Sequence, residues 1–98
     1  MRYDQGFVQS VQSVAPAVLA EIIRRQPASK ERTAFAWAVA VGPALARATT
    51  VELRERTLIV SARDARWARE IERARDTILA RLRHLLGDSA VLSIEVDQ

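Results

Sequence analysis

The chain has 98 residues, of which 49% are apolar and 28% are charged, a composition typical of one globular domain. Lysine and arginine number 15 against 12 acidic residues, a net charge of +3, and the absence of cysteine excludes disulfides, thiolate zinc sites and a cysteine nucleophile. No run of about 18 apolar residues is present, so no membrane span is expected. The N-terminus lacks the apolar core of a secretory signal. We therefore expect a single domain over residues 1–98, located in the cytoplasm.

Apolar residues at spacings of three and four predict helix over residues 7–26. Pro16 interrupts this pattern. It either kinks one long helix or occupies the first turn of a second helix, where a missing N–H is tolerated. We favour the second interpretation, which places a partly ordered helical lead over residues 1–15 and a helix over residues 16–25.

A further helix is expected after a short break. Ser29 is a suitable N-cap because its hydroxyl can accept an N–H of the first helical turn. Gly42 and Pro43 stop this helix, and Pro43 can open a short additional helical turn. The helices are predicted to pack Phe35 and Trp37 against a sheet.

From Thr49 onward the apolar period changes from 3.6 to 2, which predicts strands. Two antiparallel strands are expected over residues 49–54 and 58–62, and a third over residues 90–96. The turn between the first two lacks glycine or asparagine, so a longer or bulged connection is an alternative to a two-residue turn. The inner face is predicted to carry Val51, Leu53, Leu58, Val60, Ala62, Leu92, Ile94 and Val96. The outer face carries no aromatic residue, which disfavours base stacking on the sheet.

Residues 64–86 predict one long amphipathic helix, capped by Asp64 and stopped by Gly87. Trp67 heads its apolar stripe, and we interpret both Trp67 and Trp37 as core anchors rather than binding residues. The element order is then α-α-β-β-α-β, an α+β fold in which helices cover one face of a three-stranded sheet.

Arg75 lies within the apolar stripe of this helix when the sequence is projected at 100° per residue. We expect its side chain to reach past the sheet edge to solvent. The alternatives are pairing with a carboxylate such as Glu95 or Glu21, or a place in a contact surface.

The sequence carries no recognisable catalytic arrangement. His84 is the one histidine, and it has no carboxylate or second ligand in helical register on a rigid element. The serines lie in no nucleophile elbow, and the three isolated glycines form no phosphate loop. We expect a protein without enzymatic activity, metal, cofactor or small-molecule substrate.

The arginines are the feature with a functional interpretation. Fourteen of the 15 basic residues are arginine, whose planar guanidinium suits phosphate. Several could converge on a nucleic-acid backbone, and binding would then depend on salt. The candidate nucleic-acid-binding residues are Arg54, Arg56, Arg63, Arg66 and Arg69. The alternative is a solvated surface, because Glu70, Glu72 and Asp76 are in helical register with several of these arginines.

Five segments together resemble one known family. They are Phe-Ala-Trp-Ala-Val-Ala-Val-Gly at 35–42, Ala-Arg-Ala-Thr-Thr-Val at 46–51, Leu-Ile-Val at 58–60, Arg-Trp-Ala-Arg-Glu-Ile at 66–71 and Leu-Leu-Gly at 85–87. This combination resembles the DciA-like family of bacterial proteins, which includes an operator or loader of the replicative helicase, over about residues 30–96. Members often have glycine before the Leu-x-Val strand, where this chain has Arg54-Glu55-Arg56.

The resemblance implies a KH-like fold, association with a DnaB-type replicative helicase, and binding of single-stranded or forked DNA. A GxxG loop is absent, so the KH mode of clamping nucleic acid is not implied. We expect a non-catalytic DNA-replication accessory protein. The alternative is a protein-interaction module that binds no nucleic acid. The choice between DNA and RNA, the helicase surface contacted and the oligomeric state stay open.

Overall fold

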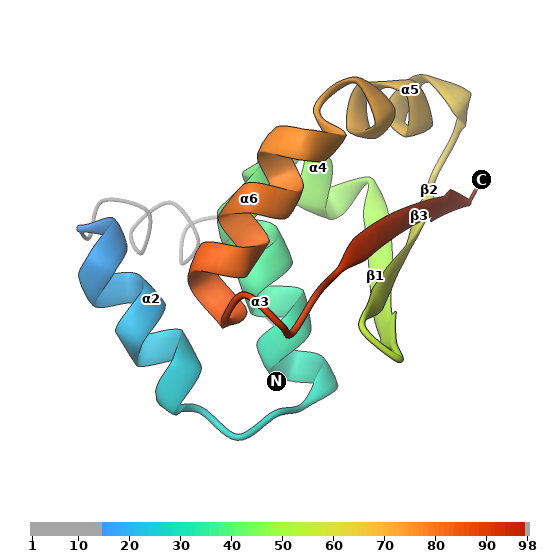
Figure 1. Ribbon diagram of the computed structural model, residues 1–98. Coiled ribbons are helices and arrows are strands. Elements are labelled where there is room, and N and C mark those ends of the chain that lie inside the picture. Colours follow the sequence, from blue (N-terminus) through green and yellow to red (C-terminus); the bar gives the residue numbers. More distant parts are fainter. Residues whose placement is uncertain (1–14, 98) are drawn as a thin grey trace.

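The computed structural model describes residues 15–97, which form the arrangement seen in Figure 1. The elements are α2 Pro16–Arg25, α3 Lys30–Val41, α4 Pro43–Arg47, β1 Thr49–Arg54, β2 Thr57–Ala62, α5 Ala65–Arg73, α6 Arg75–Leu86 and β3 Ser93–Asp97. The helical lead expected over residues 1–15 lies outside the described residues, except for Ala15. Pro16 opens α2, as predicted. The α+β class and the order α-α-β-β-α-β are confirmed.

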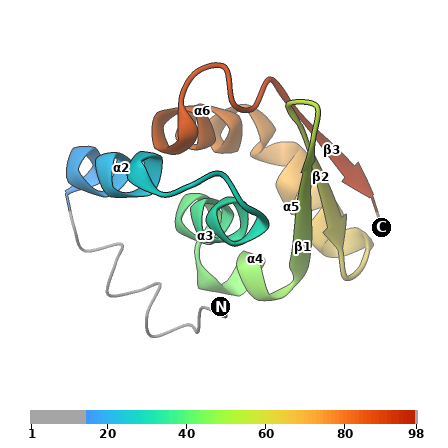
Figure 2. The ribbon, with the colours of Figure 1, turned by 90° about the horizontal axis from the view of Figure 1, so that it is seen from below.

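The sheet has the strand order β1-β2-β3. β1 and β2 form an antiparallel hairpin whose register pairs Thr49 with Ala62 and Arg54 with Thr57. β3 joins the other side of β2 in parallel, and this pairing places Ile94 beside Leu58. Parallel strands need a crossover connection, which α5 and α6 supply. Figure 2 shows α2, α3, α4 and α6 on one side of the strands, as expected.

The core lies between this covered face and the helices. Leu58, Val60 and Ile94 supply the sheet side, and each is at most 2% exposed. Ile71 of α5 and Leu82 of α6 are 0% exposed against them. Burying such a side chain stabilises a fold by roughly 1.5–3 kcal/mol. This layer therefore holds α5 and α6 firmly against the hairpin.

Both predicted helix caps are confirmed. The Ser29 hydroxyl accepts a hydrogen bond from the Arg32 backbone N–H at 3.0 Å, which begins α3. The Asp64 carboxylate accepts one from the Trp67 N–H at 3.2 Å, which begins α5. A carboxylate at this position also suits the positive end of the helix dipole.

The single helix predicted over residues 64–86 is wrong, because the chain forms two helices that meet at Ala74. Ala74 has φ −100° and ψ 10°, outside the helical region. α5 contacts β2 and β3, whereas α6 contacts α2 and α3, so the two helices must take different directions. Alanine is the best helix former, and the sequence therefore holds no local signal of the break.

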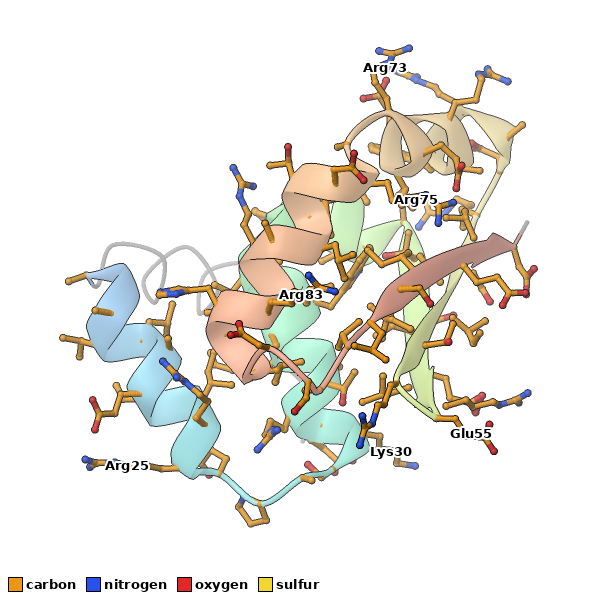
Figure 3. All side chains as sticks on the ribbon, in the orientation of Figure 1. Arg25, Lys30, Glu55, Arg73, Arg75 and Arg83 are labelled. Carbon is orange, nitrogen blue, oxygen red and sulfur yellow. The ribbon has the colours of Figure 1, made fainter. Side chains whose placement is uncertain are left out.

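Arg75 follows this break and turns toward the sheet (Figure 3). One guanidinium nitrogen donates to the backbone carbonyl of Ile94, and the other donates to the Glu72 carboxylate. The side chain is 36% exposed, in agreement with a place at the sheet edge. Its carboxylate partner is Glu72 of α5 rather than the alternatives Glu95 or Glu21.

The third strand begins later than predicted, at Ser93, and the residues before it face opposite to expectation. Val91 is 0% exposed, whereas Leu92, expected to face inward, is 49% exposed. Residues 88–90 form a turn, so the period of two does not extend back from the strand. Leu53, also expected inside, is 37% exposed because it lies near the end of edge strand β1.

The hairpin connection has two residues, rather than the longer or bulged form that the sequence left open. Glu55 and Arg56 make the turn with φ +48° and +70°, and Arg54 pairs directly with Thr57. Two-residue hairpin turns with positive φ at both positions match the right-handed twist of the strands, and they favour the sequence Asn-Gly. The Arg56 carbonyl accepts a hydrogen bond from the Leu92 N–H at 2.8 Å, which helps to hold the turn.

Candidate nucleic-acid interface

The five candidate arginines do not converge, because β2 separates them into two groups. Arg54 and Arg56 lie at the hairpin turn, where β2 begins. Arg63 follows the last residue of β2, and Arg66 and Arg69 lie on α5. At about 3.3 Å per residue, the seven steps from Arg56 to Arg63 place the two groups roughly 23 Å apart. Figure 1 shows the hairpin turn and α5 at opposite ends of the strands.

The second group is joined by an arginine that the sequence analysis missed. The hairpin register brings the end of α4 beside the residue after β2, and the Arg63 N–H donates to the Ala48 carbonyl at 2.8 Å. The Arg63 guanidinium donates to the Arg47 carbonyl at 3.2 Å. We name the exposed residues Arg47, Arg63, Arg66 and Arg69 the basic corner. Extending the hairpin pairing by two residues beyond each strand would have brought Arg47 to this site.

Carboxylates on α5 pair with arginines outside the basic corner. Glu70 contacts Arg73 at 3.4 Å, and Glu72 contacts Arg75. Within residues 15–97, no salt bridge involves a member of the basic corner. Their guanidinium groups are therefore available to an anion from outside.

The hairpin turn is electrically balanced. Arg54 pairs with Glu52 at 2.8 Å, and both side chains are more than half exposed. Glu55 lies between Arg54 and Arg56, so two carboxylates accompany two guanidinium groups. This end of the sheet should attract phosphate less than the basic corner, because net charge sets the local potential.

The outer face of the sheet is unsuited to nucleic acid. It forms an open hollow of about 630 Å³, lined in part by Glu52, Glu95 and Asp97. The large apolar side chain at its centre is Ile59, and no aromatic residue lines it. Carboxylates repel phosphates, and bases would find no ring on which to stack. The expectation that the sheet face is not a stacking surface agrees with this composition.

The one histidine of the chain lies within residues 15–97. His84 is exposed on α6, and this part of the chain brings no three potential metal-ligating side chains together. The same residues contain no helix with the length and apolarity that crossing a bilayer requires.

The fold and the basic corner define a class: a small α+β domain whose arginines gather beside one helix and whose open sheet face is acidic. A family model described as "Dna[CI] antecedent, DciA" matches residues 10–96, nearly the whole chain. The chain therefore belongs to the DciA family, as its sequence motifs indicated, and membership supports a helicase loader-type role in DNA replication. No curated protein and no solved structure was found to match the chain. The KH-like fold that the family resemblance implies stays a prediction.

Proposed function

We propose that this protein is a non-catalytic, cytoplasmic replication accessory factor that binds single-stranded or forked DNA and contacts the replicative helicase. The proposal rests chiefly on the basic corner, where four exposed arginines lie together without an ion pair to a described carboxylate. Family membership supports the helicase as the protein partner. No cofactor or metal is required for either interaction.

Guanidinium groups at the basic corner suit a phosphate backbone for a physical reason. Each can donate two parallel hydrogen bonds to phosphate oxygens, and each neutralised phosphate releases counterions into solution. Arg66 and Arg69 are three residues apart on α5, so their side chains leave the same side of the helix. Arg63 lies just before the helix, and the three can follow one strand of DNA. The balanced hairpin turn would act as a weaker second contact through Arg54 and Arg56.

The test is a fluorescence-anisotropy titration of a labelled single-stranded oligonucleotide at several salt concentrations. We expect affinity to fall steeply with salt, and the double variant Arg66→Gln, Arg69→Gln to flatten the logarithmic slope by about 1.4, at about 0.7 per phosphate contact. Arg25→Gln is the matched control, because Arg25 pairs with Glu21 on α2, away from α5 (Figure 3). Absence of binding even at about 50 mM salt would refute the proposal.

The second candidate function is a protein-interaction module that binds no nucleic acid. It is favoured by the ion pairs that four arginines make with neighbouring carboxylates, as expected of solvated surfaces. Co-precipitation with the purified helicase before and after nuclease treatment separates the two. Helicase binding that survives nuclease, in a protein that binds no oligonucleotide, would establish this second function.

A further inference from the structure

The two tryptophans occupy very different environments. Trp37 is 2% exposed, and its indole Nε1 donates to the Thr49 hydroxyl at 2.9 Å. Trp67 is only half-buried, and it lies in the first turn of α5 between two members of the basic corner. The predicted role of core anchor therefore explains the position of Trp37 fully, but it explains only part of the environment of Trp67. Trp67 packs against the core on one part of its surface and reaches the surface with the rest.

A cationic side chain, that of Arg66, lies over the indole ring of Trp67. The guanidinium carbon of Arg66 lies 5.9 Å from the centre of the indole ring, within the range of a cation–π contact. Arg66 itself is exposed, so solvent rather than core lies beyond it. Such a contact is weak at an exposed site, so a ligand can displace the guanidinium from the ring.

We propose that Trp67 is a base-stacking platform, on which an unpaired base of bound DNA lies against the indole ring. This inference rests on the proposed binding of nucleic acid and adds to it the reason for single-strand preference. Arg66 moves from the ring to a flanking phosphate or covers the far side of the base, and Arg63 and Arg69 bind adjacent phosphates. Bases within a duplex are already stacked on both faces, so a duplex gains nothing from the ring. The aromatic-free outer sheet face offers no competing platform.

A comparison of two oligonucleotides separates stacking from phosphate binding. One is a single-stranded oligothymidylate, and the other has the same length and phosphates but abasic sugars at every position. We expect the wild-type protein to bind the abasic strand about 5- to 150-fold more weakly, the range corresponding to loss of one base–aromatic stack of 1–3 kcal/mol. The salt dependence of the two strands should be equal, because their phosphates are the same.

Intrinsic fluorescence supplies an independent readout. Oligothymidylate should quench the emission of the wild-type protein, and the abasic strand should not. In Trp67→Phe the ring against the core is retained, but quenching should disappear because the remaining Trp37 is buried. Trp67→Ala should lose the same 5- to 150-fold in affinity for oligothymidylate while its affinity for the abasic strand is unchanged. If Trp67→Ala does not fold, the affinities of the wild-type protein for oligothymidylate and for the abasic strand, together with quenching in Trp67→Phe, still test the stacking proposal.

The contrary outcomes distinguish failure of the stacking proposal from failure of the proposed binding of nucleic acid. Equal affinity of the wild-type protein for both strands would overturn stacking on Trp67 and leave the phosphate-binding function standing. Quenching that persists in Trp67→Phe would also overturn it. Failure to bind either strand at low salt would instead overturn the proposed binding of nucleic acid.

Discussion

The indole of Trp37 and the hydroxyl of Thr49 form a partly buried hydrogen bond of 2.9 Å between α3 and the first residue of β1. The same hydroxyl donates to the Leu45 carbonyl of α4 at 2.8 Å. One threonine thus satisfies a buried indole N–H and a helix-end carbonyl together. This junction sets where the hairpin begins, and hence where Arg63 and α5 lie.

Replacing Thr49 by valine tests this junction. The shape and strand propensity are retained, but the Trp37 indole N–H loses its partner, whereas the Leu45 carbonyl keeps the hydrogen bond from the Ala48 N–H at 3.1 Å. We expect the free energy of unfolding to fall by about 1–3 kcal/mol, the cost of a buried polar group left unpaired. Urea denaturation followed by circular dichroism measures the change. The control Thr50→Val, at an exposed neighbouring position, should stay within about 0.5 kcal/mol of the wild type; equal losses in both variants would contradict the explanation.

Changing the hairpin turn to Asn-Gly should stabilise the protein. Glu55 and Arg56 both have positive φ, a conformation that is costly for residues other than glycine, asparagine and aspartate. The double variant Glu55→Asn, Arg56→Gly should raise the free energy of unfolding by about 1 kcal/mol. Arg56→Ala keeps the costly conformation and should give no gain. A denaturation midpoint unchanged by Asn-Gly would show that the turn is not strained.

Arg75 is expected to stabilise the fold more than a neighbouring surface arginine. It joins α6 to the Ile94 carbonyl of β3 and to Glu72 of α5, across the break at Ala74. Arg75→Met should lower the free energy of unfolding by about 1–2 kcal/mol, because a charge-assisted hydrogen bond to the strand is lost from a partly exposed site. Arg73→Met removes only the exposed pair with Glu70 and should cost less than about 0.5 kcal/mol. Similar losses from the two substitutions, measured by thermal or urea unfolding, would contradict this assignment.

The two groups of arginines should contribute independently to DNA binding. Arg54→Gln with Arg56→Gln should weaken binding less than Arg66→Gln with Arg69→Gln, because Glu52 and Glu55 already balance the hairpin turn. Effects at sites more than about 10 Å apart usually add, so the fourfold variant should show their sum. An oligonucleotide too short to span roughly 23 Å should not detect the hairpin substitutions at all. A hairpin effect on such a short strand, measured by anisotropy, would place the binding site at the turn instead.

Local patterns in the sequence were sufficient for most elements. The caps Ser29 and Asp64, the proline that opens α2 and the change of period at Thr49 are short-range signals, and each predicted a boundary correctly. These signals succeed because capping and side-chain alternation depend on residues within one or two turns. The family motifs work in the same way, as short stretches at recognisable spacings.

The candidate site depended on longer-range geometry. The strand over residues 57–62 separates the candidate arginines into two groups, Arg54 with Arg56 at one end and Arg63, Arg66 and Arg69 at the other. Arg47 joined the second group only through the hairpin register.

The sequence by itself determined the class, the order of elements and the presence of an arginine-rich surface. Only the tertiary structure decided that the helix breaks at Ala74, that Leu92 faces out, and that Trp67 is only partly buried while Trp37 is fully buried. The physical reason is that an apolar stripe shows that a residue can be covered, whereas the surrounding elements decide which residues are covered. Two tryptophans with the same local pattern therefore differ because one lies under the junction of α3 and β1 and the other at the rim of α5.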